Sequence, residues 1–101
     1  MNAKKCIVFI RFKYKDKLAS TKMNDVLGKM FYLRTFDGAS FSVTDNRSLA
    51  SIIGSRKDAN YIVKVLKEIL KSKHSIQKYA STYEINYGYE PYDVIIDTID
   101  I

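Results

Sequence analysis

The residues of this sequence best suited to chemistry are a row of cations at every second position of one segment. The row consists of Arg11, Lys13, Lys15 and Lys17, and Phe9 lies in the same phase ahead of it. Because alternate residues of a β-strand point to one face, these side chains would project together from a sheet. Lysine and arginine neutralise phosphates and aromatic rings stack on bases, which is how sheet-surface proteins hold single-stranded nucleic acid. We therefore predict a nucleic-acid-binding face on this strand.

A β-hairpin predicted further along the chain would widen that face. Residues 31–36 and 39–44 are rich in β-prone side chains and flank Asp37-Gly38, which is typical of a two-residue turn with positive φ at both positions. In that register Tyr32 faces Val43. Alternatively, the aromatic residues of the hairpin form its core face. The predicted nucleic-acid-binding residues are Phe9, Arg11, Lys13, Lys15, Lys17, Tyr32, Arg34 and Phe36.

Tyrosines concentrate near the C-terminus, in a stretch that has no lysine or arginine. Five of the eight tyrosines lie there, together with five acidic residues. Tyrosine combines a large apolar area with a polar tip and is enriched at interfaces, so we predict a protein interface or a homodimer contact here. The alternative is the ordinary preference of tyrosine for strands. The predicted interface residues are Tyr79, Tyr83, Tyr87, Tyr89 and Tyr92.

The residue types needed for catalysis are sparse. The single cysteine, Cys6, lies in an apolar run and is expected to be a buried hydrophobe, and the single histidine, His74, lies among lysines. Asp93 and Asp97 would share a strand face but stand roughly 13 Å apart at ~3.3 Å per residue. We expect no catalytic residue, metal or cofactor. A small metal-dependent hydrolase or nuclease using these two aspartates or Asp45 is the alternative.

The charges of the chain are divided unequally along its length. The net charge is +6, and all 17 Lys/Arg but only six of the 11 acids lie in residues 1–78, which therefore carry +11 against −5 in residues 79–101. A basic body predicts an anionic partner. Compensation of the two halves within the fold, or head-to-tail self-association, is the alternative.

Cysteine content and hydropathy also constrain the location and class of the protein. One cysteine excludes an internal disulfide, and the apolar run near the start is too short for a signal peptide or a membrane span, so we expect a cytoplasmic protein without membrane contact. In size and composition the chain is similar to small phage or viral inhibitors such as anti-CRISPR proteins. This similarity implies an alternative function: a regulator in the host cytoplasm that blocks a host protein or a nucleoprotein complex, for example through the tyrosine-rich region.

A single α+β domain over residues 1–101 has to position these groups. Alternation predicts a first strand whose core face is Cys6, Val8, Ile10, Phe12 and Tyr14. The other predicted elements are a helix over 20–30, the hairpin, short helical turns over 45–53, a helix over 57–73, and strands over 78–88 and 92–100. This order favours an antiparallel sheet of four or five strands with one long and one or two short helices. A ferredoxin-like βαββαβ arrangement with an extra C-terminal strand is the first choice, and a meander sheet with one long helix is the alternative.

Overall fold

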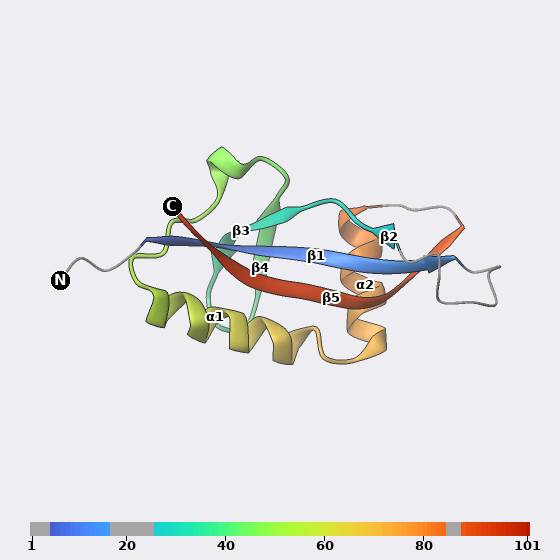
Figure 1. Cartoon of the computed structure of the whole chain (residues 1–101). Coiled ribbons are helices and arrows are strands. Elements are labelled where there is room, and N and C mark those ends of the chain that lie inside the picture. Colours follow the sequence, from blue (N-terminus) through green and yellow to red (C-terminus); the bar gives the residue numbers. More distant parts are fainter. Residues whose placement is uncertain (1–4, 17–25, 85–87) are drawn as a thin grey trace.

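The first strand lies at the centre of the sheet because both of its edges are paired. The computed structural model describes residues 5–16, 26–84 and 88–101. β1 (Cys6–Asp16) pairs along one edge with β5 (Tyr89–Asp100), from Cys6 opposite Asp100 to Asp16 opposite Tyr89. Its other edge pairs with β3 (Phe31–Phe36) near Phe9 and with the short β2 (Val26–Leu27) near Tyr14. Figure 1 shows β1 and β5 as the two long strands that run the length of the molecule.

The α+β class is confirmed, with a five-stranded antiparallel sheet and two helices among the described residues. The ferredoxin-like order is not confirmed. The segment Val26–Leu27, predicted to be helical, forms β2, and its expected start at residues 20–25 lies outside the described residues. β1, β3 and β4 (Phe41–Thr44) are neighbours in chain order, which is a meander, and β5 returns to the far side of β1. The alternative, a meander with one long helix, is met only in part, because β5 pairs with β1 instead of β4 and the chain forms two helices.

Two helices replace the single long helix and the strand predicted after it. α1 (Arg56–Ile69) begins after Ser55, whose side chain accepts from the backbone N–H of Asp58. α2 (Lys73–Tyr83) begins after Ser72, which caps it in the same way. The strand predicted over 78–88 was wrong for its first six residues, because Ile76 and Ala80 lie four residues apart and bury one side of a helix against the sheet. The predicted 45–53 turns reduce to one 3-10 turn, η2 (Arg47–Leu49).

The hairpin turn lies one residue later than predicted. The backbone N–H of Asp37 donates to the carbonyl of Ser40 (3.1 Å), so Gly38 and Ala39 form the turn, and only Gly38 has positive φ (96°). The Asp37 carboxylate accepts from both Ser40 and Ala39, and these hydrogen bonds lower the pKa of that carboxyl. As a result Phe41 lies opposite Phe36, Val43 lies opposite Leu33, and Tyr32 faces Thr44 instead of Val43.

The core forms between the sheet and the two helices. The predicted core face of β1 is confirmed, because the side chains from Cys6 to Tyr14 in that phase are at most 3% exposed. Ala59, Val63 and Leu66 of α1 and Ile76 and Ala80 of α2 close the core from the other side. Burial of these apolar side chains is the main term that stabilises the fold. In the part of the chain that the structure describes, no helix is both long and apolar enough to cross a bilayer.

Candidate nucleic-acid interface

The predicted cations of β1 project from the face of the sheet opposite the helices. Phe9, Arg11 and Lys13 are half-buried on this outer face and Lys15 is exposed. Tyr32 of β3 lies directly opposite Phe9, so the structure brings these two aromatic side chains together as predicted. The outer face thus contains half of the predicted binding residues in one continuous stretch of β1 and one more on β3.

The acidic strand β5 runs beside these cations. Lys13 lies opposite Asp93, Lys15 lies opposite Glu90, and Phe9 lies opposite Asp97. The Nζ of Lys15 is 4.0 Å from Oε2 of Glu90. Two of the three cations therefore lie opposite carboxylates, and Arg11 lies opposite Ile95 with Asp93 and Asp97 on either side of it. With three cations and three carboxylates, this part of the outer face has no net formal charge.

Arg11 is held by the backbone next to β1. Its Nε–H donates to the carbonyl oxygen of Gly28 at 2.7 Å. The position of Gly28 is fixed in turn, because its own N–H donates to the carbonyl of Phe12 (2.8 Å). A Cβ at this glycine would collide with Oε1 of Glu84 and lie 2.7 Å from the ring of Tyr14, so no other residue fits without a shift. The guanidinium of Arg11 is therefore partly committed to the fold.

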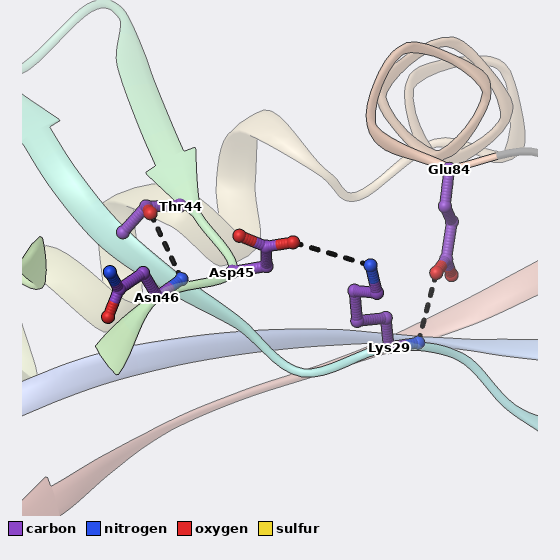
Figure 2. Close-up of polar contacts among 5 residues, drawn as sticks. All are labelled: Lys29, Thr44, Asp45, Asn46 and Glu84. Carbon is purple, nitrogen blue, oxygen red and sulfur yellow. Dashed lines mark hydrogen bonds and ion pairs between the residues drawn. The ribbon is translucent and has the colours of Figure 1, made fainter. Parts of the chain in front are cut away.

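Glu84 and Lys29 connect the end of α2 to the segment between β2 and β3 (Figure 2). Glu84 accepts a hydrogen bond from the hydroxyl of Tyr14 (2.6 Å) through Oε1 and from the backbone N–H of Lys29 (3.0 Å) through Oε2. The Nζ of Lys29 also lies 3.3 Å from Oδ2 of Asp45. Asp45, an acid considered above for metal-assisted chemistry, thus has a lysine as its partner.

The other predicted nucleic-acid-binding residues are dispersed. Arg34 is exposed on β3 at the point where its register with β4 shifts. Phe36 packs against the hydrophobic core, as do Phe41 and Val43, so these side chains point away from the outer face. The alternative for the hairpin therefore applies to these three residues. Lys17 lies outside the described residues.

Most of the tyrosines predicted to form an interface pack against the core instead. Tyr79 and Tyr83 belong to α2, where Tyr79 stacks on Phe41 with ring centroids 4.9 Å apart and Tyr83 contacts Phe31 at 5.6 Å. Burial, together with the neighbouring Tyr79, raises the pKa of Tyr83 to about 12. Tyr89 packs against the core as well, and Tyr87 lies outside the described residues.

Tyr92 of β5 lies on the sheet near the predicted cations. The Nζ of Lys13 lies 5.7 Å from the centroid of its ring. This distance is within the range of a cation–π contact, which adds a further local partner for Lys13. The partners predicted for the tyrosine region as a protein or dimer interface remain predictions.

A second group of lysines, on α1, was not proposed as a site from the sequence. Lys57, Lys64 and Lys67 project from the side of α1 that faces away from the sheet, and Lys71 lies two residues after the last residue of the helix. We call these four residues the α1 lysine row. All are exposed, and none forms an ion pair with another described residue. The sequence feature that could have identified this group was the position of the lysines opposite the apolar stripe of the helix.

The α1 lysine row also contains one aromatic and one acidic side chain. Tyr61, 62% exposed, lies between Lys57 and Lys64 on the same side of the helix. Glu68 is exposed and adjoins Lys64 and Lys67, so the row of four lysines carries a net charge of +3. Lys57 and Lys67 are ten residue steps apart, so this part of the row extends about 15 Å along the helix at 1.5 Å per residue.

Groups suited to metal binding do not cluster in the described part of the chain. Within residues 5–16, 26–84 and 88–101, no three His, Cys, Asp or Glu side chains lie close enough to hold a metal ion. Cys6 is buried as predicted, and its thiol lies 3.4 Å from Oδ1 of Asp100. His74 is exposed in the first turn of α2 rather than at the end of the long helix predicted there.

No protein-family model, curated protein or solved structure matches this chain. The charges, contacts and exposure of the described residues are therefore the basis on which a function can be proposed.

Proposed function

We propose that this protein is a non-enzymatic binding module for nucleic acid and that the α1 lysine row is its principal contact surface. One observation carries the proposal: three exposed lysines lie on one side of a helix with a fourth just beyond its end, and no described carboxylate forms an ion pair with any of them. Unpaired ammonium groups attract phosphates strongly, because neutralising each phosphate releases condensed counterions.

Charge decides between the two basic surfaces. The outer face of β1 opposes its cations with Glu90, Asp93 and Asp97, so a phosphate approaching it would also meet three carboxylates. The α1 lysine row has a net charge of +3, and Glu68 is its only acid. Like charges placed opposite each other disfavour association, so the helix offers the better surface for a polyanion.

The side chains of the row indicate how the nucleic acid would be held. Lysine ammonium groups act as point charges and contact phosphates without reading bases. A row about 15 Å long covers about four phosphates of one strand at ~3.4 Å per phosphate along a duplex axis. Tyr61 is the one exposed aromatic ring in the row, so stacking is a minor contribution. We therefore expect binding that is independent of sequence and steeply dependent on salt.

The test is a salt titration of binding to a fluorescent 20-base-pair DNA duplex, followed by fluorescence anisotropy. The test variant is Lys57→Gln/Lys64→Gln/Lys67→Gln/Lys71→Gln. A matched control removes three cations of the sheet and the lysine that precedes β1, as Lys5→Gln/Lys13→Gln/Lys15→Gln/Arg34→Gln. With about four phosphate contacts, the wild-type plot of log K against log salt should have a slope of roughly −3 to −4, and the helix variant should bring it close to zero.

The control should keep most of the wild-type slope and lose less than about tenfold in affinity, since it changes only long-range attraction. Wild-type protein that shows no salt-dependent binding to duplex or single-stranded DNA or RNA would overturn the proposal. A larger loss in the sheet control than in the helix variant would overturn the choice of surface.

A further inference from the structure

β5 forms one edge of the sheet, and its free side presents backbone groups. It is twelve residues long and, among the described residues, pairs with β1 alone. Figure 1 shows it as the outermost long strand, with β1 on one side only. An exposed edge of this length is a template on which another strand can add.

The hydrogen-bond pattern identifies which groups point outward. The N–H of Ile101 donates to the carbonyl of Lys5 (3.0 Å), so these residues form a hydrogen-bonded pair with β1. Hydrogen-bonded and non-hydrogen-bonded pairs alternate in an antiparallel ladder. From Asp93 to the end of β5, beyond the register shift, the odd-numbered residues therefore bond to β1, and Val94, Ile96 and Thr98 turn their N–H and C=O groups to the free edge.

Two of these outward N–H groups are already occupied by carboxylates of the same strand. Oδ1 of Asp93 accepts from the N–H of Val94 at 2.8 Å, and Oδ1 of Asp97 accepts from the N–H of Thr98 at 2.7 Å. Both aspartates are exposed. Each one thus places a negative charge on the edge and removes a donor that an added strand would need.

A second copy of this chain fits the edge in one register better than in its neighbours. An antiparallel β5–β5′ pair centred on Ile96 places Asp93 opposite Ile99 and Asp97 opposite Ile95 of the other copy. Shifting the register by two residues puts Asp97 opposite Asp97, or Asp93 opposite Asp97, which like-charge repulsion disfavours. In the favoured register the pairs Val94–Thr98, Ile96–Ile96 and Thr98–Val94 would form about six backbone hydrogen bonds.

We propose that β5 is a self-pairing edge that Asp93 and Asp97 keep closed, so that the protein is monomeric through this edge until both carboxylates are removed. The two occupied donors on each copy account for four of those six hydrogen bonds. Pairing would therefore require both copies to break their side-chain contacts and to bring the charged strands together. This inference is independent of the α1 lysine row, which lies on the opposite side of α1 from the sheet.

The experiment is size-exclusion chromatography with light scattering over a range of protein concentrations. Wild-type protein should elute at the monomer mass of 11.7 kDa. The variant Asp93→Ala/Asp97→Ala should form a dimer whose fraction rises with concentration, as mass action requires. The matched control Asp58→Ala/Glu68→Ala removes two exposed acids from α1 and should stay monomeric, which separates the edge effect from the change in net charge.

A third substitution tests that the dimer uses this edge. Thr98→Pro in the double variant deletes one outward N–H without removing a bond to β1, and proline is tolerated on edge strands. It should return the double variant to a monomer. A double variant that remains monomeric at hundreds of micromolar, or a dimer that survives Thr98→Pro, would overturn the proposal, as would a wild-type dimer that Thr98→Pro dissociates.

A measurement on the wild-type protein covers the case in which the double variant does not fold. Amide proton shifts of Val94 and Thr98 should change little with temperature, because both N–H groups are hydrogen-bonded to carboxylates. The amide of Ile96 at the same edge should change more. Equal temperature dependence of the amide proton shifts of Val94, Ile96 and Thr98 would contradict the proposal that the two aspartates occupy this edge.

Discussion

The outer face of β1 and the exposed side of α1 carry the same kind of side chain in different surroundings. On β1, Lys13 lies opposite Asp93 and over the ring of Tyr92, and Lys15 lies beside Glu90. On α1, Lys57, Lys64 and Lys67 have no described ion-pair partner. The difference arises because an interior strand always has neighbours on both edges, whereas one side of a surface helix faces only solvent.

The density of lysines along a chain therefore does not by itself locate an anion-binding surface. The first strand has the more conspicuous row of cations, but a strand far away in the sequence neutralises it. Attraction for a polyanion depends on the charge left after local pairing, since the field at a surface is the sum over all nearby groups. The helix retains more of that charge than the sheet.

Charge reversal should separate the two surfaces most strongly. Lys64→Glu/Lys67→Glu should weaken binding to a DNA duplex about a hundredfold at low salt, because it turns a local charge of +3 to −1. Lys13→Glu/Lys15→Glu should cost no more than about tenfold, since these cations are already opposed by carboxylates. Fluorescence anisotropy measures both dissociation constants. Equal losses would show that the two surfaces do not differ.

The free energy of unfolding should depend more on the lysines of β1 than on those of α1, which is the opposite of their order in DNA binding. Lys13→Ala/Lys15→Ala removes a cation–π contact and an ion pair and leaves Asp93 opposite an alanine, so it should cost about 1 kcal/mol. Lys64→Ala/Lys67→Ala should change the free energy of unfolding by less than about 0.5 kcal/mol, because these side chains are exposed and alanine favours a helix. Urea unfolding followed by circular dichroism measures both. A greater loss from the helix pair would mean that its lysines have structural partners.

Removing single acids should give the smallest effect. Glu68→Gln takes away the one acid of the α1 lysine row and should tighten DNA binding about threefold. Glu90→Gln releases Lys15 and Lys73, which lie 4.0 Å and 3.6 Å from its carboxylate oxygens, but leaves Asp93 and Asp97 in place. Its gain in affinity should be below about twofold. A larger gain from Glu90→Gln than from Glu68→Gln would reverse the preference for the helix.

Much of the fold could be predicted where a local pattern and burial agree. Strict alternation from Cys6 to Tyr14 predicted the core face of β1, and the apolar stripe from Ala59 to Leu66 predicted α1. The alternating tyrosines misled, because Tyr79 and Tyr83 are two strand repeats apart but also one helical turn apart. Packing of Ile76 and Ala80 against the sheet favours the helix, and the tyrosine pattern contains no signal of that tertiary contact.

The candidate site could be predicted only in part for a similar reason. Phe9, Arg11, Lys13 and Lys15 do share an outer face, as their spacing indicated. These cations are neutralised because β5 lies next to β1. From the sequence, compensation between the basic residues 1–78 and the acidic residues 79–101 was only one of the alternatives. Pairings between distant segments leave no periodic pattern in either segment. The lysines of α1 were visible opposite the apolar stripe, but their lack of partners could be seen only in three dimensions.

The central place of β1 has a consequence for how the chain reaches its native state. Both edges of this strand are filled by later segments, and its longest partner includes a contact between residues 94 positions apart. Contacts this distant require closure of a large loop, which slows folding in proteins dominated by them. Until β5 arrives, the apolar run from Cys6 to Ile10 lacks its main partner, and an unpaired segment of this kind is prone to aggregate. A chaperone that covers this run until β5 is available should therefore raise the yield of folded protein.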